Sequence, residues 1–294
     1  MLVWMIDARP REIFGNTGLI PAVHAVVSEE SFSAFAARNG GVDLRQLSDL
    51  AYASYPEASL VVVRGGFDPV RIEQAFRARA EPPDGRALDA GPAEPRLAPI
   101  TRLWGTVHGH REQLAIFGRD AVALERGHFG PLRTAEAFAH ARLKKSKPAL
   151  REAPLLRAAE LLGDAPLRGF APGPFEGEWG SALGGLVKAS TAVAFAVRPA
   201  ADAGGVDGKL DATLLLLGGW GDLATEAAAH LEAAYRRVTD APLARLCGLD
   251  NPVDGPRARG NAEALTLEVS LDAVGLARGL RAATAANVGE IMAY

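Results

Sequence analysis

Several features that would point to a particular kind of protein are scarce or missing in this chain. Its 294 residues include one cysteine, Cys247, which excludes an internal disulfide and any multi-cysteine metal cluster. No run of 18 or more apolar residues occurs, so the sequence predicts no transmembrane helix. The N-terminal residues also lack the basic and apolar regions of a signal peptide.

The excess of one charge sign over the other is also small. The formal net charge is −3, with 23% charged and 48% hydrophobic residues, which is the composition of a globular protein. A net charge this small creates no field that would attract nucleic acid or an anionic membrane surface. We therefore predict no nucleic-acid partner. The length is sufficient for one large domain or two ordinary ones.

The clearest pattern is a strand, a Gly-Gly-aromatic turn and a helix, which occurs twice. Residues 60–63 form a β-branched run typical of a buried strand. Gly65-Gly66-Phe67 follows, and Asp68-Pro69 has the residue types that begin a helix. The second copy, at 214–237, contains a Leu run, Gly218-Gly219-Trp220 and a long Ala/Glu/Arg helix. This repetition predicts two halves related by duplication.

The remaining pattern predicts hairpins with helices packed beside them. We expect strands at 2–6, 60–63, 102–107, 113–117, 121–125, 191–197, 210–217 and 264–271. We expect helices at 31–38, 43–52, 69–80, 134–143, 150–162, 222–237 and 272–287. The predicted fold class is α+β, with two duplicated halves whose antiparallel sheets are each backed by helices. The halves are predicted at 1–165 and 181–294, joined by a Pro/Gly-rich junction at 166–180.

The order of signals in the first part of the chain resembles a known group of proteins. Gly41-Val42-Asp43-Leu44, then Gly66-Phe67-Asp68, then the stretch AIFGRDAVAL at 115–124 are similar to uncharacterised bacterial exported or lipoprotein-type domains. The opening Trp4-Met5-Ile6-Asp7 also resembles the start of such domains after a signal or lipid anchor. The resemblance covers residues 2–180. It implies a location in the periplasm or cell envelope if a leader was removed, and it carries no activity with it.

Two histidines form the candidate metal site. His108 and His110 flank Gly109, so both rings could point to the same side of a strand or turn and share a metal ion. A third ligand would come from Glu112, Asp120 or His128. The alternative is a polar hairpin tip in which Gly109 makes the turn.

Three aromatic residues in the Pro/Gly-rich junction form the candidate partner-binding site. Phe170, Phe175 and Trp179 either fill the joint between the halves or form an exposed docking surface. Large aromatic side chains are mostly buried, which favours the first arrangement.

Other motifs are better explained by structure than by chemistry. Neither Gly-Gly turn matches a nucleotide-binding motif, so we predict no cofactor. Gly180-Ser181-Ala182-Leu183-Gly184 lacks the spacing of a nucleophile elbow, and Cys247 has no base beside it. The basic residues of 142–147 fit a helix C-terminus, and Asp250 with Asp254 lacks the spacing of a calcium loop.

Two functions follow from these observations. The first is a non-enzymatic binding or structural module of the bacterial cell envelope that holds a protein partner. The second is a metal-dependent hydrolase that uses His108 and His110. Since no catalytic constellation is recognisable in the sequence, the first is favoured and an enzyme is the less expected outcome. Without a removed leader the location would be cytoplasmic.

Overall fold

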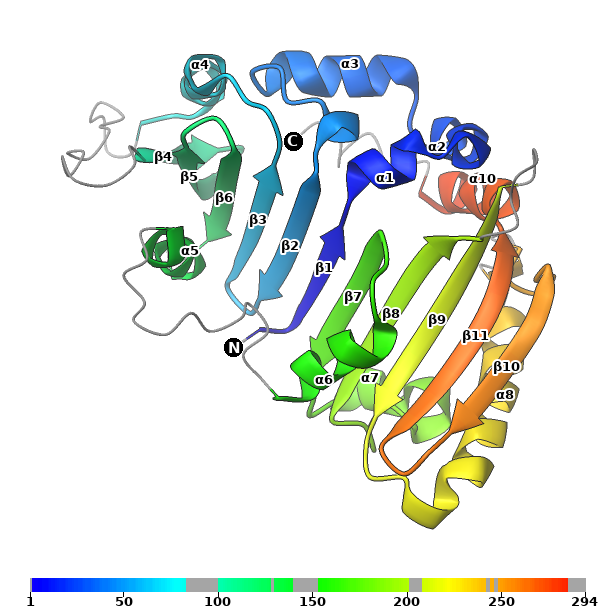
Figure 1. Cartoon of the computed structure of the whole chain (residues 1–294). Coiled ribbons are helices and arrows are strands. Elements are labelled where there is room, and N and C mark those ends of the chain that lie inside the picture. Colours follow the sequence, from blue (N-terminus) through cyan, green and yellow to red (C-terminus); the bar gives the residue numbers. More distant parts are fainter. Residues whose placement is uncertain are drawn as a thin grey trace. The chain divides into compact units, whose positions relative to one another are not determined.

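The computed structural model describes residues 2–82, 100–127, 130–139, 153–200, 208–241, 244–245 and 248–284 (Figure 1). The chain divides into two compact units. Unit 1 comprises Met1–Arg11 and Glu30–Ala149, and unit 2 comprises Glu12–Glu29 and Leu150–Tyr294. Both contain antiparallel strands and helices, so the predicted α+β class is confirmed.

The sheet of unit 1 has the strand order β1-β2-β3-β6-β5-β4, and every neighbouring pair is antiparallel. Its strands are β1 (Trp4–Ala8), β2 (Asp49–Tyr55), β3 (Ala58–Arg64), β4 (Ile100–Val107), β5 (His110–Phe117) and β6 (Ala121–Gly127). The predicted hairpin around Gly109 is therefore the β4–β5 hairpin.

Helices cover both faces of this sheet. On one face, Ile72 and Phe76 of α4 (Pro69–Arg79) pack with apolar side chains of β4, β5 and β6. On the other, Leu132 of α5 (Pro131–Ala139) packs with Leu60 and the small Ala115 and Ala123. Because successive residues of a strand point to opposite faces of the sheet, the side chains of these strands point alternately toward α4 and toward α5. Three further elements before β2 are α1 (Pro10–Gly15), α3 (Glu29–Arg38) and η2 (Leu44–Gln46).

The sheet of unit 2 has the strand order β7-β8-β9-β11-β10, again antiparallel throughout. Its strands are β7 (Leu167–Pro172), β8 (Ala192–Pro199), β9 (Lys209–Leu217), β10 (Asp254–Gly260) and β11 (Ala264–Asp272). The longest pairing joins β9 to β11 over all nine residues of each strand.

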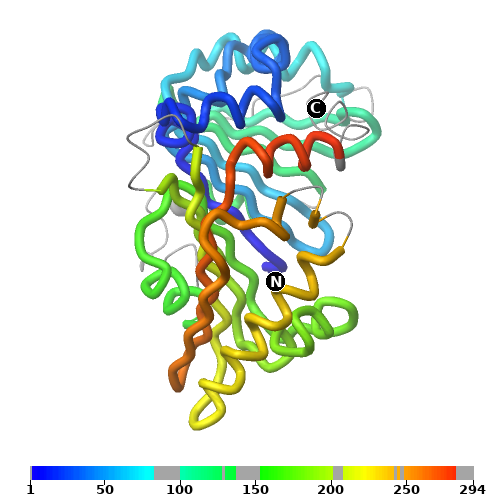
Figure 2. The backbone as a smooth tube through the Cα atoms, turned by 90° about the vertical axis from the view of Figure 1, so that its right-hand side faces the viewer, coloured from blue at the N-terminus to red at the C-terminus, as the bar shows by residue number. Residues whose placement is uncertain are grey.

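Figure 2 shows the helices of unit 2 on both sides of its sheet. One side carries α8 (Ala224–Thr239) and the turn η4 (Ala182–Gly185), which share an apolar cluster with β9 and β11. The short helix α7 (Gly177–Ser181) contacts η4. The other side carries α6 (Ala153–Leu162), which lies over β7, β8 and β9. Helix α10 (Ala273–Thr284) packs against α2 (Ile20–Val26), which follows η1 (Thr17–Leu19).

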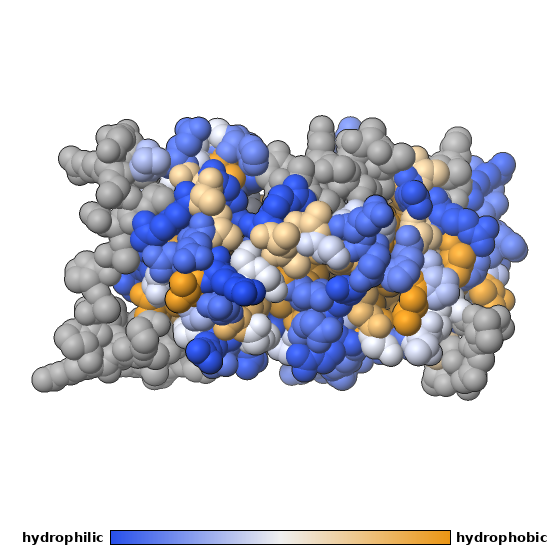
Figure 3. All heavy atoms as spheres, turned by 90° about the horizontal axis from the view of Figure 1, so that it is seen from above, coloured by the Kyte–Doolittle hydropathy of each residue, from blue (hydrophilic) through white to orange (hydrophobic). Residues whose placement is uncertain are grey.

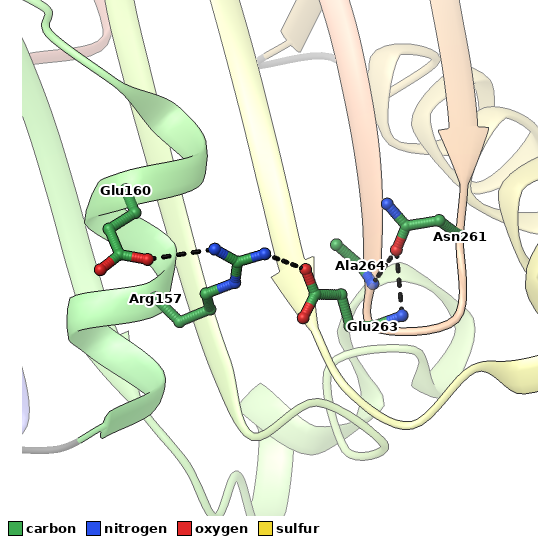
Figure 4. A network of polar contacts seen from close by, with 5 residues as sticks. All are labelled: Arg157, Glu160, Asn261, Glu263 and Ala264. Atoms are coloured by element: carbon green, nitrogen blue, oxygen red, sulfur yellow. Dashed lines mark hydrogen bonds and ion pairs between the residues drawn. The ribbon is translucent and has the colours of Figure 1, made fainter.

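Helix α6 is also tied to the hairpin turn between β10 and β11 (Figure 4). The Arg157 guanidinium binds Glu160 on its own helix at 3.1 Å and Glu263 in the turn at 2.5 Å. Asn261 accepts hydrogen bonds from the backbone N–H groups of Glu263 and Ala264, at 3.0 and 2.9 Å. The Asn261 hydrogen bonds therefore hold the shape of the turn, and the ion pair with Arg157 holds the turn against α6.

The two units repeat one topology. Unit 1 runs β1, helices, β2, β3, α4, then β5, β6 and α5, with β4 added at the outer edge. Unit 2 runs β7, α7, β8, β9, α8, then β10, β11 and α10. The equivalent strands lie in the same order, so that β1-β2-β3-β6-β5 of unit 1 corresponds to β7-β8-β9-β11-β10 of unit 2.

The predicted Gly-Gly-aromatic turn occupies the same place in both units, between the third strand and the next helix. In each, two backbone N–H groups of the turn donate to two carbonyls in the tip of a neighbouring hairpin. The bonds are Gly65 to Asp120 (3.0 Å), Phe67 to Arg119 (2.9 Å), Gly218 to Glu263 (3.0 Å) and Trp220 to Ala262 (2.9 Å). Both aromatic residues are 8% exposed. The motif therefore has a structural role: it joins strand, helix and hairpin.

Three predicted elements differ from the structure. Residues 43–52 do not form a helix, because Asp43 caps only η2 and strand β2 begins at Asp49. The junction 166–180 contains β7, whose central Gly169 lies under the Phe195 ring of β8. Residues 254–260, for which the sequence predicted neither a strand nor a helix, form β10, an edge strand that tolerates Pro256.

The compact units also differ from the predicted halves 1–165 and 181–294. Residues 12–29 and 150–165 group with unit 2, because α2 packs on α10 and α6 packs on β8. None of the helices in the described part of the chain combines the length and the apolar composition that a bilayer crossing requires.

Candidate functional site

The predicted histidine pair lies at the tip of the β4–β5 hairpin. His108 and Gly109 form its two-residue turn and both have positive φ, +48° and +78°, as hairpin turns require. His110 begins β5, and both histidine side chains are exposed. The turn geometry itself explains why a glycine follows His108.

The proposed third metal ligands do not join the histidines. Glu112 is 4% exposed, and its Oε1 accepts from Arg126 Nη2 at 3.1 Å. Asp120 follows the opposite end of β5, and His128 lies outside the described residues. Within the described ranges no three His, Cys, Asp or Glu side chains are grouped to hold a metal ion. The metal site stays a prediction without geometric support.

Glu112 instead forms an ion pair with one arginine and acts electrostatically on a second, both on the α4 face of unit 1. Besides Arg126, it acts on Arg79, whose pKa is lowered by burial while the Glu112 charge opposes that shift. Arg79 donates to Asn39 Oδ1 at 2.7 Å, and its guanidinium lies 5.5 Å from the centre of the Phe76 ring. This carboxylate therefore serves packing between α4 and the sheet.

The three predicted aromatic residues fall into two environments. Phe170 and Phe175 are 3% and 8% exposed, whereas Trp179 is 68% exposed. Phe170 belongs to β7, and Phe175 packs with Trp220 and Leu231 in the cluster under α8. The two phenylalanines are core residues, and Trp179 is the one that a partner could reach.

The segment that carries Trp179 is fixed at both ends. Phe175 anchors it before α7, and Leu186 with Val187 anchors it after η4, all three in the cluster under α8. A Cβ at Gly180 would lie 2.9 Å from the Phe175 carbonyl oxygen, so the helix folds tightly over its own anchor. The Ser181 hydroxyl donates to the Glu178 carbonyl at 2.8 Å.

Turn η4 then brings this segment against α8. Leu183 takes a left-handed conformation with φ of +52°, which costs about 1–2 kcal/mol for a side chain of this type. Leu183 and Ala182 pack on the cluster under α8, and a Cβ at Gly184 would meet the His230 ring. The contacts of the cluster offset the backbone strain.

The structure also contains a buried carboxylate that the sequence analysis did not single out. Glu125 in β6 is fully buried and accepts backbone N–H groups of Gly130 (3.1 Å) and Leu132 (2.7 Å) at the start of α5. Burial raises its pKa, and these two hydrogen bonds and Arg133 oppose the shift. The sequence did contain a signal for this burial: Glu125 lies two residues after Ala123, so both side chains point to the same face of the strand.

The other candidates have structural explanations or lie outside the described residues. Asp68 caps α4 by accepting the N–H groups of Val70 and Arg71, so the turn before it does not present them to a phosphate. Cys247 and the basic residues of 142–147 fall outside the described ranges. Asp250 and Asp254 belong to no group of three metal-binding side chains in the described part.

The exposed surface offers few apolar contact points. In the view of Figure 3 hydrophilic residues cover most of the described surface, and hydrophobic ones form small separate groups. Large hydrophobic side chains more than half exposed are few among the described residues: Val70 (60%), Trp179 (68%) and Leu223 (66%). Trp179 is the largest of them.

Comparisons with known proteins identify a fold. No protein-family model and no curated protein matches the chain. Two crystal forms of TP0453, a protein of Treponema pallidum, have a similar structure. Form I has a TM-score of 0.53 at 10% identity, covering 96% of this chain and 94% of TP0453. Form III has a TM-score of 0.51 at 9% identity, covering 96% and 95%.

Proposed function

We propose that the protein is a non-enzymatic binding or structural module of the bacterial cell envelope that holds a protein partner. The observation that carries the proposal is the likeness to TP0453, a membrane-associated protein, across 96% of this chain. The buried carboxylates among the described residues support the proposal, because they cap a helix or form ion pairs that stabilise packing. The expected location is the periplasm or envelope, after removal of a leader.

The proposal is tested in the native host with a C-terminally tagged, chromosomally encoded chain. Cells are fractionated, lightly cross-linked, and the protein is purified for intact-mass analysis. We expect it in the envelope fraction together with a stoichiometric protein partner. A cytoplasmic monomer that carries one bound zinc ion would overturn the proposal and favour the hydrolase built on His108 and His110.

The same proposal includes an internal duplication, predicted from the sequence as halves 1–165 and 181–294 joined at 166–180. The repeated elements begin at β1 in the first half and at β7, inside the predicted junction, in the second. The repeated strand order and the paired hydrogen bonds of the two Gly-Gly-aromatic turns support it. Two units with the same strand order have similar helix-covered faces, which suits a structural or binding role.

A further inference from the structure

We propose that the outer edge of β10 binds an extended, acidic segment of a protein partner as an additional antiparallel strand. This inference rests on the proposed binding function and names the surface and the chemistry of the partner. It starts from the position of β10, which ends the strand order of unit 2 and is drawn outermost in its sheet (Figure 1). An edge strand presents backbone N–H and C=O groups with which another chain can pair.

Unit 1 shows which kind of element such an edge accepts. The hairpin tips align the two units, because Asp120 and Glu263 accept the same hydrogen bond from the Gly-Gly-aromatic turns. Counted from these tips, the strand pairing makes Ala258 of β10 the counterpart of Leu114 in β5. In unit 1 the antiparallel strand β4 occupies the outer side of β5. In unit 2 no strand of the described ranges occupies the outer side of β10.

The second half of β10 directs backbone groups to this outer side. The N–H of Asn261 donates to the Ala264 carbonyl at 2.9 Å across the β10–β11 turn, and bonding in an antiparallel pair alternates along the strand. The N–H and C=O groups of Ala258 and Gly260 therefore face outward. The first half of the strand is less suited to pairing, because Pro256 has no N–H and lies at a register shift.

The side chains of this second half favour an acidic partner. Arg257 and Arg259 are exposed and stand two residues apart, so both lie on one face of the strand. On the β11 side, Arg257 lies opposite Glu268 and Arg259 lies opposite the uncharged Thr266. Neither arginine forms an ion pair with a residue of the described ranges. An added strand would place its own residues directly opposite both arginines, where opposite charges stabilise the pairing.

Between its acidic residues the partner segment would carry an apolar one. Ala258 packs on the cluster under α8, and its counterpart Leu114 lies opposite Leu103 of β4, which is 0% exposed. A partner residue opposite Ala258 would take the place that Leu103 has in unit 1. The segment is therefore acidic–apolar–acidic. A second copy of β10 would instead bring arginine opposite arginine, and like charges across a strand pair are destabilising.

The test uses the full-length protein and the fluorescein-labelled peptide GSTEVETSG, in which both glutamates lie on one face of an extended strand. Binding is measured by fluorescence anisotropy at physiological salt. The control peptide GSTEEVTSG has the same composition and charge but places its glutamates on opposite faces. We expect GSTEVETSG to bind, and GSTEEVTSG to bind about fivefold more weakly, the loss of one cross-strand charge pair. Equal binding of the two peptides, or no binding of the first, would overturn the inference.

Backbone methylation of the peptide separates strand addition from simple charge attraction. In the antiparallel arrangement the valine N–H of GSTEVETSG pairs with Ala258, and the N–H groups of both glutamates point away from β10. We expect N-methylation of the valine to weaken binding by about tenfold or more, and N-methylation of the first glutamate to leave it unchanged. If the N-methyl-valine peptide binds as the unmodified one does, no strand is added and the inference is wrong.

Variants of the protein locate the peptide on β10. The double variant R257Q/R259Q should bind GSTEVETSG about tenfold more weakly, since both cross-strand charge pairs are lost. The matched control R237Q/R278Q removes two exposed arginines from α8 and α10 and should bind the peptide as the native chain does. The same loss in both double variants would mean that net charge, and not the edge of β10, attracts the peptide.

Two further measurements complete the test. Analytical ultracentrifugation of the native chain is done with and without GSTEVETSG. A dimer that the peptide dissociates would show that a second copy occupies the edge, which overturns the inference. The partner purified from the host is compared between the native chain and R257Q/R259Q, and loss of the partner from the variant supports the inference. If the variant retains it in full, the docking edge is wrong and the proposed function stands. If the native chain retains no partner, the proposed function fails, and this inference with it.

Discussion

Single residues determine how firmly helices attach to the sheet of unit 1, and Glu125 is the clearest case. Its carboxylate spans the first turn of α5, taking one N–H group on each oxygen. Such a cap normally stabilises a helix start by about 1 kcal/mol. Here the cap is fully buried, so its charge also carries a desolvation cost, and this cost raises the pKa of the Glu125 carboxyl.

The raised pKa of Glu125 makes stability depend on pH in a definite direction. Between its ordinary pKa and its raised pKa the folded chain binds more protons than the unfolded chain, so the Glu125 contribution to stability falls as pH rises through this window. We predict that the unfolding free energy of the native chain, minus that of Glu125→Gln, increases as pH is lowered through this window toward the ordinary pKa of a glutamate. The slope can reach about 1.4 kcal/mol per pH unit.

The measurement is urea unfolding of both proteins at several pH values. Taking the difference removes the contribution of every other carboxylate that the two proteins share. A difference that stays constant, or that decreases toward low pH, would show that the Glu125 pKa is not raised in the folded chain.

Gly40 and Gly41 at the end of α3 provide a second prediction, since both have positive φ, +68° and +87°. A Cβ at Gly40 would lie 2.6 Å from the backbone of Arg71 in α4, whereas a Cβ at Gly41 would meet nothing within 4 Å. We expect Gly41→Ala to cost about 1 kcal/mol through left-handed strain alone. Gly40→Ala should cost about 1–3 kcal/mol more, because α4 must also move. Urea unfolding checks both values, and equal losses would contradict the close approach.

At the scale of elements, the α2–α10 pair shows how small side chains bring helices together. Ala22 on α2 and Ala273 and Ala277 on α10 are 7%, 2% and 4% exposed, and Leu19 packs with them. Arg281 donates to the carbonyl of Ala25 near the end of α2 at 3.3 Å. Unit 2 therefore contains a helix whose sequence lies between two elements of unit 1.

Overfilling this helix pair should loosen it. We predict that Ala277→Leu destabilises unit 2 by about 1–3 kcal/mol, because the added side chain has no space at the interface. Arg278→Leu adds the same side chain at the next, exposed position of α10 and should change stability by less than about 0.5 kcal/mol. Amide hydrogen exchange in residues 20–26 is the direct measurement. Faster exchange in both variants, or in neither, would contradict the prediction.

The elements that could be predicted from the sequence are those with a strong local pattern. The alternation of Leu265, Leu267, Val269 and Leu271 correctly predicted β11, because one face of that strand is buried. β7 and β10 were missed, since their Pro and Gly residues are tolerated only in their particular places in the sheet. The helix predicted at 43–52 was wrong, because sheet pairing of β2 with β1 and β3 outweighed a helix-like start.

The candidate site could be predicted from the sequence only in part, and the physical reason for each failure differs from residue to residue. Phe175 and Trp179 stand four positions apart and have opposite environments, and only the packing of Phe175 into the cluster under α8 decides which is buried. The buried Glu125 bonds to N–H groups five and seven residues along the chain, across a turn that has no sequence motif. Phe67 and Trp220 are both 8% exposed, as expected from the Gly-Gly-aromatic repeat that is visible in the sequence.

At the scale of the whole molecule, the chain passes between the two units at 11–12, 29–30 and 149–150. A fragment of residues 150–294 therefore contains every strand of unit 2 but lacks α2. We predict that this fragment unfolds at lower urea concentration than unit 2 of the full chain. A peptide of residues 12–29 should raise its midpoint in a concentration-dependent way, because it binds the folded fragment.

The matched control is the same peptide with Ala22→Glu, which places a charge in the α2–α10 interface. This variant peptide should leave the midpoint unchanged. A fragment as stable as unit 2 in the full chain, with no response to the native peptide, would show that α2 contributes nothing to unit 2.

The bond between Arg281 and Ala25 joins positions 256 residues apart, and this distance has a consequence for biosynthesis. A ribosome adds about 5–20 residues per second, so α10 is made roughly 13–50 s after α2. During that interval α2 has emerged without its partner, while the strands of unit 1 on either side of it can already pair. Unit 2 can therefore be completed only after α10 has left the ribosome, and the earliest part of its structure to be made is among the last to be fixed in place.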